Sequence, residues 1–393
     1  MKLIHKTTAI VLSLVLMIPI FAVSTLTTYA VTTISDGEYK YAVISDDSLA
    51  LYRYLGNETE LRLPESYGGR NIIGIYEDCF SESGITSVTI PESYSYIGDS
   101  AFYGCKDLSE IKIPKGIESI GMYAFSECTS LSKCDIIAAE SLRSIPEGCF
   151  SGDVSLNSIY IPLMIGSIGD NAFANSGLNS VKLPISILKL GSGAFRGCGE
   201  LSKVSLSSEL TEISEEAFLG CAKIESISLT GKIKKIGYSA FEGCTSLSNV
   251  ELTNTLTEIE ARAFYDDTSL KKILIPNTVT SIGPNAFAPM SYQNTIEITC
   301  FKNSYAEKYC YENSVNNYVS VDGLVGDVNN DGEVTILDVS FIQKYLNRDY
   351  EIESPVLQLQ ADVNKDGTIT IRDATLIQMY LAHYFDSFDD EIQ

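Results

Sequence analysis

Two stretches near the C-terminus have the residue types and spacing of calcium-binding loops. DVNNDGEVTILD at 327–338 and DVNKDGTITIRD at 362–373 each place oxygen-bearing side chains at positions 1, 3, 5 and 12 and a glycine at position 6. Calcium takes about six to eight oxygen ligands, and position 7 of such a loop adds a backbone carbonyl. Position 12 departs from the usual loop, because it has Asp instead of Glu. The sequence predicts two Ca²⁺ ions, the first bound by Asp327, Asn329, Asp331, Glu333 and Asp338 and the second by Asp362, Asn364, Asp366, Thr368 and Asp373.

The segments around these loops predict a loop followed by a helix, twice. Residues 336–346 and 371–381 place apolar side chains at helical spacing, whereas 319–326 is rich in β-branched residues and glycine and is a poor helix. Duplicated loop–helix units without a leading helix resemble the type I dockerin domain of cellulosomal proteins, here over 326–385. A calcium-stabilised structural tail or an ordinary pair of EF-hands remains the alternative.

The dockerin resemblance implies a partner, the cohesin module of a scaffoldin. The apolar pair Ile336 and Leu337 is similar to that of ruminococcal dockerins, and the near-symmetry of the two copies implies two docking orientations. The positions that contact cohesin in this family correspond here to Ile336, Leu337, Gln343, Lys344, Arg348, Ile371, Arg372, Gln378, Met379 and His383.

The N-terminal thirty residues have the pattern of a secretion signal. Lys2 and Lys6 precede an apolar stretch from Ala9 to Val23, and Thr28-Tyr29-Ala30 provides small residues at the −3 and −1 positions of a cleavage site. We therefore expect a secreted, extracellular protein with no membrane span, associated with the cell surface through a scaffoldin. The net charge of −23 excludes nucleic acid as a natural partner, because no basic stripe offsets it.

The rest of the chain repeats with a period of about 23 residues. A phenylalanine preceded by a small residue marks each repeat, an apolar residue follows at about the sixth position, and a short I-x-x-I-G step closes the unit. Such units bury their apolar faces only by stacking on each other. The marker residues are Phe80, Phe102, Phe125, Phe150, Phe173, Phe195, Phe218, Phe241, Phe264 and Phe287.

This repeat resembles the BspA-like leucine-rich-repeat family. The expected fold is a β-rich leucine-rich-repeat solenoid of about ten 22–25-residue repeats, followed by a small all-α dockerin with two calcium loop–helix motifs. The expected domains are a signal peptide at 1–30, an N-terminal cap hairpin at 31–60, the solenoid with its C-terminal cap at 61–312, a linker at 313–325, the dockerin at 326–385 and an acidic tail at 386–393.

The cysteines follow the repeat and do not form paired spacings. Five of them stand three residues after the marker phenylalanine, where Asp153, Ser176 and Asp267 stand in other repeats. Free cysteine behaves there as a small buried group. Only Cys300 and Cys310, in the expected cap, are placed to pair, and the sequence leaves that disulfide open.

Catalytic residues are scarce. After removal of the signal peptide the only histidine is His383, which excludes serine- or cysteine-based triads and histidine-bound zinc in the solenoid. The carboxylates fall on surface positions, so we expect no catalytic residue and a chain that is not an enzyme. An enzyme or inhibitor of the degradative complex, or a surface adhesin anchored through the dockerin, remains the alternative.

Binding is then the expected role of the solenoid, with a protein or the cell wall as ligand. Its outward strand positions are polar, rich in serine and nearly free of aromatic rings, which makes a weak carbohydrate site. Tyr94, Tyr96, Tyr103 and Tyr123 offer an edge patch, or they pad the cap and outer turns.

Overall fold

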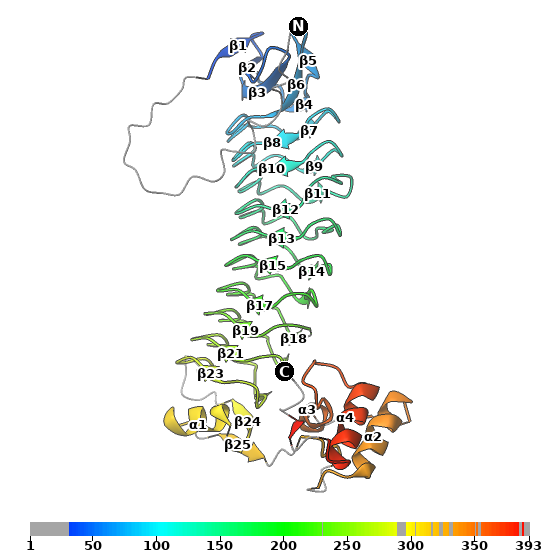
Figure 1. Ribbon diagram of the computed structural model, residues 1–393. Helices are drawn as coiled ribbons and strands as arrows, with labels where there is room; N and C mark the ends of the chain where they lie inside the picture. Colours follow the sequence, from blue (N-terminus) through cyan, green and yellow to red (C-terminus); the bar gives the residue numbers. More distant parts are fainter. Residues whose placement is uncertain are drawn as a thin grey trace, which may run out of the picture. The chain divides into compact units, whose positions relative to one another are not determined.

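The computed structural model describes residues 31–229, 231–288, 296–302, 304–315, 317–321, 325–329, 333–349, 351–352, 355–384 and 387–388. Residues 33–321 form a stack of repeats, and the residues after them form a small helical module (Figure 1). Each part has its own hydrophobic core. The expected signal peptide at 1–30 and most of the expected acidic tail lie outside the described residues.

Each repeat contributes short strands to two parallel series. The first series consists of β4 (Glu60–Arg62), β7 (Ser87–Thr89), β9 (Glu110–Lys112), β11 (Lys133–Asp135), β14 (Ser180–Lys182), β16 (Lys203–Ser205), β18 (Ser226–Ser228), β20 (Asn249–Glu251) and β22 (Lys272–Leu274). The second consists of β6 (Arg70–Ile75), β8 (Tyr96–Ile97), β10 (Ser119–Ile120), β12 (Ser144–Ile145), β13 (Ser167–Ile168), β15 (Lys189–Leu190), β17 (Glu212–Ile213), β19 (Lys235–Ile236), β21 (Glu258–Ile259) and β23 (Ser281–Ile282).

The sequence period sets the register of these strands. Lys133 of β11 lies beside Glu110 of β9, and Lys235 of β19 lies beside Glu212 of β17, one repeat earlier in each pair. The central residue of a first-series strand is mostly buried and its two neighbours are exposed, as in Glu110–Lys112. The glycine of the I-x-x-I-G step permits close stacking, because a Cβ on Gly121 would lie 2.3 Å from the backbone nitrogen of Asp99.

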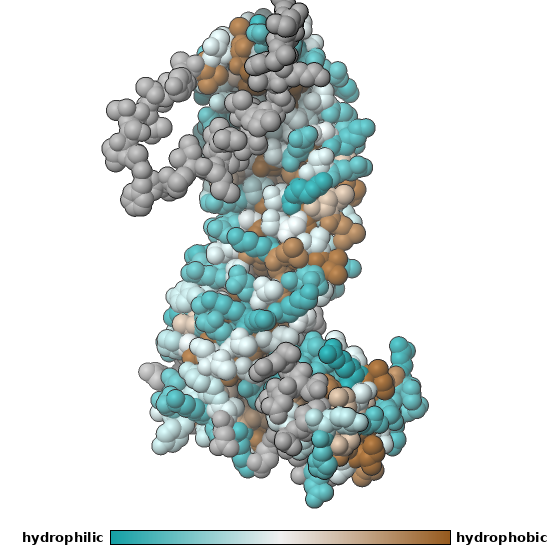
Figure 2. Space-filling model, viewed as in Figure 1, coloured by the Kyte–Doolittle hydropathy of each residue, from teal (hydrophilic) through white to brown (hydrophobic). Residues whose placement is uncertain are grey.

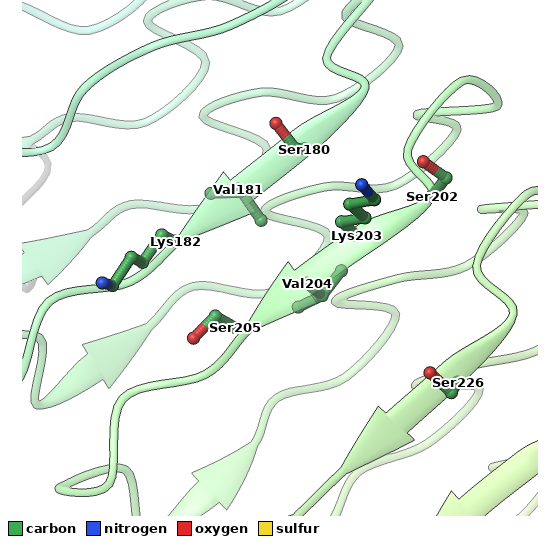
Figure 3. A pocket seen from close by; sticks show the side chains of 8 residues that line it. All are labelled: Ser180, Val181, Lys182, Ser202, Lys203, Val204, Ser205 and Ser226. Carbon is green, nitrogen blue, oxygen red and sulfur yellow. The ribbon is translucent and has the colours of Figure 1, made fainter.

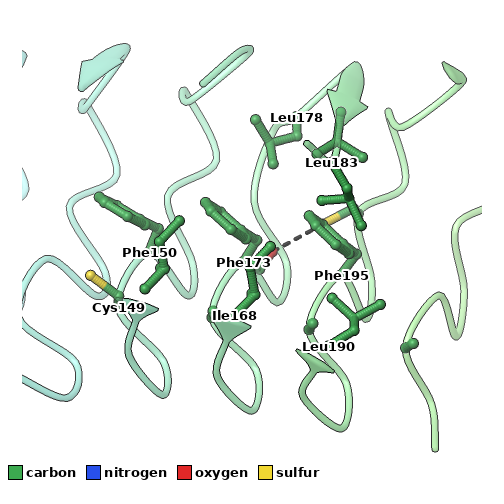
Figure 4. Packing of buried hydrophobic residues seen from close by; sticks show 14 of the residues in the cluster. Cys149, Phe150, Ile168, Phe173, Leu178, Leu183, Leu190 and Phe195 are labelled. Atoms are coloured by element: carbon green, nitrogen blue, oxygen red, sulfur yellow. Dashed lines mark hydrogen bonds between the residues drawn. The ribbon is translucent and has the colours of Figure 1, made fainter. Parts of the chain in front are cut away.

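The ten marker phenylalanines form one continuous stack in the core. Consecutive rings are nearly parallel, with centroids 5.1 to 5.7 Å apart from Phe80 to Phe287. Their side chains are buried, and so are the small residues before them (Figure 4). The expectation that phenylalanine and its small neighbour point inward is confirmed.

The cysteines at the third position after phenylalanine join adjacent repeats. The thiol of Cys198 donates a hydrogen bond to the carbonyl of Phe173 at 3.0 Å (Figure 4). The other four cysteines at this position bond in the same way to the preceding phenylalanine carbonyl. All ten cysteines are buried and free, and the thiols of Cys300 and Cys310 are hydrogen-bonded to each other.

Two repeats have a carboxylic acid at this cysteine position. Asp153 accepts a hydrogen bond from the backbone N–H of Cys128 at 2.9 Å, and Asp267 accepts one from Cys244 at 2.8 Å. The second carboxyl oxygen of each is buried without a hydrogen-bond partner. Burial raises the pKa of both groups well above the usual range for Asp.

Caps close both ends of the stack. At the start, the strands β1 (Thr33–Ser35), β2 (Tyr39–Val43) and β3 (Ser48–Tyr54) are antiparallel, β3 runs parallel to β6, and β5 (Ser66–Tyr67) pairs with β6. At the other end, β24 (Glu297–Phe301) pairs with β22 and is followed by α1 (Tyr305–Glu312). The strand β25 (Tyr318–Val321), within the segment expected to be a linker, pairs with β24.

One expected strand is missing. Ser158 and Tyr160 stand at outward strand positions of their repeat, yet residues 156–161 form no strand between β11 and β14. The preceding repeat holds two extra residues and folds them into a turn, in which the N–H of Ala139 donates to the carbonyl of Ile136. We attribute the missing strand to this insertion, because it interrupts the 23-residue register.

The helical module contains α2 (Ile336–Leu346), α3 (Pro355–Ala361) and α4 (Ile371–Leu381). Helices α2 and α4 pack on each other, with Val339, Ile342 and Ile377 buried between them. Among the described residues, the strand β25 and no helix precedes the first loop, which agrees with the expectation of no leading helix there. The expectation of no leading helix is wrong for the second loop, because the seven-residue α3 precedes it.

Candidate calcium loops and docking face

Both calcium loops end in the same helix cap. Thr335 accepts a hydrogen bond from the N–H of Leu337, while Asp338 accepts one from the N–H of Thr335 at 2.7 Å. Thr370 and Asp373 repeat this arrangement at the start of α4. The sequence reasoning missed the two threonines, although T-x-x-D before an apolar run is a recognised signature of a capping box.

The first loop places its terminal carboxylates in a buried position. Asp327 and Asp338, the expected ligands at positions 1 and 12, are almost fully buried. The second carboxyl oxygen of Asp338 accepts hydrogen bonds from the N–H groups of Val328 at 2.8 Å and Asn329 at 3.1 Å. The expected ligand Glu333 is exposed, and Asp331 lies outside the described residues.

The second loop is described from end to end. The two oxygens of Asp362 accept hydrogen bonds from the N–H groups of Asp366 at 3.1 Å and Gly367 at 2.9 Å. Asn364 contacts Asp366, and the N–H of Asn364 donates to Asp373 at 3.3 Å. The structure thus links four of the predicted ligand residues of this loop in one series of hydrogen bonds, from Asp362 through Asp366 and Asn364 to Asp373. Thr368 joins the series through Asp366.

The electrostatics of the second loop fit a cation. Burial raises the pKa of Asp362 to about 6, and the carboxylates of Asp373 and Asp366 add to the rise. Burial also raises the pKa of Asp373, again with a contribution from Asp366. A divalent ion would lower both values, because it stabilises the ionised carboxylates.

The donor set also suits calcium. Every predicted ligand atom is an oxygen, as hard cations require. Among the described residues, no three Asp, Glu, His or Cys side chains gather closely enough to hold a metal by themselves. Asparagine, a backbone carbonyl and water would therefore complete the shell, as they do in calcium loops generally.

The predicted cohesin-contact residues are on the surface. Ile336, Leu337 and Ile371 at the first turns of α2 and α4 are between 55% and 61% exposed, which is unusual for aliphatic side chains. Of the other predicted contacts, Met379 is half-buried. The remaining ones are exposed, namely Gln343, Lys344, Arg348, Arg372, Gln378 and His383. Their role in binding stays a prediction.

The four tyrosines, which the sequence left as either an edge patch or padding, differ in their exposure. Tyr94 is fully buried and its hydroxyl donates to the carbonyl of Pro64 at 2.7 Å, so it belongs to the core. Tyr96 is half-buried, and Tyr103 and Tyr123 are just over one-third exposed. The tyrosines therefore mainly pad the repeats.

The strand face of the solenoid has an open pocket of about 340 Å³ (Figure 3). Lys182 and Lys203 extend from neighbouring strands β14 and β16, with serines between and beside them. The pocket contains no carboxylate and no aromatic ring, so it offers positive charge and hydroxyl groups to a ligand.

No helix in the described part of the chain is long and apolar enough to cross a membrane. The molecule is thus defined by two features, a stack of phenylalanine-centred repeats and a helical module with duplicated oxygen-rich loops.

Comparison with known proteins agrees with both features. The model of the BspA type leucine-rich repeat region matches residues 73–201 and 189–318, and that of the dockerin type I domain matches residues 325–382. The chain belongs to the BspA-type leucine-rich repeat family and carries a C-terminal type I dockerin domain. No curated protein matches it.

Solved structures of bacterial leucine-rich repeat proteins are similar to the chain. One is a leucine-rich cell surface protein from Faecalibacterium prausnitzii, with 23% identity, coverage of 74% of this chain and 94% of that one, and a TM-score of 0.43. Another is a leucine-rich repeat protein from T. pallidum, with 27% identity, coverage of 55% and 91%, and a TM-score of 0.41.

The two modules define the general role. A type I dockerin implies cohesin binding in a cellulosome-like complex, and a leucine-rich repeat solenoid is a binding platform. Both matched modules are non-catalytic, and no catalytic domain is identified.

Proposed function

We propose that this chain is an exported, non-catalytic component of a cellulosome-type complex. Its dockerin binds two Ca²⁺ ions and, in that state, a cohesin of a scaffoldin at the cell surface. The solenoid then presents a protein- or cell-wall-binding surface beside polysaccharide-degrading enzymes. The signal-like residues 1–30 support export.

The exposed isoleucines that open α2 and α4 carry this proposal. Ile336 and Ile371 stand directly after the capping threonines, in equivalent places of the two copies, and both are mostly exposed. A loop stabilised by calcium would fix both side chains, because the position-12 aspartates cap the same helix ends. Two equivalent apolar anchors on one module suit docking in two orientations.

Calorimetric titration of the full-length protein with a panel of cohesins, in calcium and in chelator, tests the proposal. We expect tight binding to at least one cohesin in calcium and none in chelator. Calcium binding without affinity for any cohesin would reduce the module to a stabilising tail and contradict the proposal.

Single and double substitutions test the two orientations. If both modes operate, Ile336→Asp or Ile371→Asp alone leaves binding through the other copy, and the double variant loses it. Tyr311→Ser is the matched control, because this ring is also exposed but lies in α1, outside the dockerin. Loss of binding in one single variant alone would show that one mode dominates.

A further inference from the structure

A band of exposed aliphatic side chains crosses the middle of the solenoid. Figure 2 shows hydrophobic side chains gathered over this part of the molecule. The band consists of Ile137, Tyr160, Leu163, Ile185 and Leu188, each between 59% and 64% exposed, and is called the aliphatic band below. These residues come from three consecutive repeats.

The repeat register places three of the band residues, Leu163, Ile185 and Leu188, side by side. Ser167 of β13 lies beside Lys189 of β15, 22 residues later, so Leu163 and Ile185 occupy equivalent places in adjacent turns. The N–H of Leu188 donates to the carbonyl of Gly166 at 3.0 Å, which brings Leu188 next to the same turn. These three residues lie just before the paired strands β13 and β15, and paired strands are about 5 Å apart, so the turns that carry the three side chains form one surface.

The band is specific to these repeats. In the next repeat, 23 residues further along, Ser208 and Thr211 stand at the places of Ile185 and Leu188. The band residues are not part of the core, because Leu156, Ile165 and Ile187 fill it in the same repeats and are fully buried. Large contiguous exposed apolar surface on a water-soluble domain marks an interaction site.

Positive charge flanks the band. Lys182 follows Tyr160 by 22 residues, one turn further along, and Lys203 pairs with Ser180 in the pocket of the strand face. Neither lysine forms an ion pair with any described residue, although the chain has a net charge of −23. This side of an acidic protein is therefore complementary to carboxylates next to an apolar surface.

We propose that the aliphatic band and the adjacent lysines form the docking surface of the solenoid for a protein segment that combines aliphatic side chains with acidic residues. Four of the five band residues are aliphatic, and aliphatic chains provide no flat platform for a sugar ring, so a protein fits better than a glycan. This inference rests on the proposed role of the solenoid as a binding surface and gives that surface a location and a chemistry.

A random-peptide display library, selected on the full-length protein in calcium, tests the proposal. The triple variant Leu163→Ser, Ile185→Ser and Leu188→Ser removes the band, and Val154→Ser is its matched control. Val154 is 58% exposed but lies in the turn after Phe150, before the strand segment. Both variants should unfold at the same temperature as the wild type, since substitutions of exposed side chains usually leave stability nearly unchanged.

We expect enrichment of peptides that contain both aliphatic residues and Asp or Glu. These peptides should bind the triple variant at least about tenfold more weakly, and the Val154→Ser variant as well as the wild type. Lys182→Glu with Lys203→Glu should also weaken binding, and added salt should weaken it in the wild type.

Three results would overturn the proposal. The first is enrichment of peptides that lack carboxylates or that bind the triple variant as well as the wild type. The second is a concentration-dependent dimer of the wild type that only the triple variant loses. The third is binding of the wild type to a glycan array that only the triple variant loses. Cohesin titration of the same proteins separates the two proposals. If neither the wild type nor any variant binds a cohesin, the proposed function is contradicted. Peptide binding would still test whether the aliphatic band is a docking surface.

Discussion

The backbone N–H of Thr335 donates a hydrogen bond to the carboxylate of Asp338 at 2.7 Å, at the point where the first calcium loop becomes helix α2. Asp373 accepts the same bond from Thr370 in the second copy. Position 12 therefore has two roles in each copy, as a candidate calcium ligand and as the residue that completes the helix cap. Aspartate is compatible with both roles, because T-x-x-D forms a capping box and its carboxylate supplies oxygen atoms.

We expect Asp338→Ala to destabilise the dockerin more in calcium than in chelator. Loss of a helix cap costs about 0.5–2 kcal/mol of unfolding free energy in either condition. Loss of a calcium ligand adds a further cost only when calcium is bound, because the ion stabilises the folded state alone. Thermal unfolding followed by circular dichroism, with calcium and with chelator, measures both parts. Thr335→Ser is the control because it keeps the capping hydroxyl, and equal losses in the two conditions would limit Asp338 to capping.

Removal of calcium should loosen the dockerin and leave the solenoid unchanged. The predicted ligands all lie in 327–373, and the repeat core is a separate cluster of buried side chains. Hydrogen exchange measured by mass spectrometry should therefore show faster exchange in α2 and α4 after chelation, but no change in the repeats between 73 and 229. Equal acceleration in both parts would contradict this expectation.

The solenoid should become less stable as the pH rises from about 5 to 8. Burial raises the pKa of Asp153 and Asp267 in the folded state, so the fold keeps a proton that the unfolded chain releases above about pH 4. Because the folded state then binds more protons, the unfolding free energy falls as the pH rises. Urea denaturation at several pH values measures this dependence.

The Asp153→Asn and Asp267→Asn double variant isolates that effect. At pH 8 its free energy of unfolding should exceed that of the wild type by about 1–3 kcal/mol for each buried carboxyl group replaced. Its stability should also depend less on pH. Asp46→Asn is the control, because Asp46 is exposed. A double variant that follows the wild-type pH dependence would show that these two acids do not cause it.

The loss of stability on replacing a stacked phenylalanine by alanine should depend on its position in the stack. Phe195 stacks between Phe173 and Phe218 at 5.4 and 5.5 Å and is fully buried, whereas Phe287, at the end of the stack, is 7% exposed. Replacement by alanine should cost about 3–5 kcal/mol at Phe195 and less at Phe287. Phe287 stacks on a parallel ring only on the side of Phe264, and on its other side it meets Tyr309 edge-on at 6.4 Å. Urea denaturation of both variants compares the losses, and equal values would mean that stacking in the ladder is not the decisive contact.

Much of this protein could be predicted from local patterns. The period of the marker phenylalanines gave the repeats, and the duplicated loops gave the second module, because repeats and chelating loops depend on residues close together in sequence. The cap at the end of the solenoid also follows a local pattern, a strand and then a helix. The helix before the second loop was missed, since Pro355 and a seven-residue length give little periodic signal.

Other features depend on stacking and could not be read from any single repeat. Asp153 stands at a repeat position where other repeats have buried cysteine, but the unpartnered oxygen and the raised pKa of its carboxyl follow only from the turns that enclose it. Tyr94 is likewise part of the core, because neighbouring turns bury its ring. The missing strand at 156–161 follows from an insertion one turn earlier.

The sequence by itself determined the repeat, its inward residues and the two oxygen-rich loops, because each depends on composition and spacing within about two dozen residues. Only the tertiary structure decided which outward side chains of separate turns share a surface. Leu163 and Ile185 become neighbours through the strand register, and that register results from the stacking of whole turns.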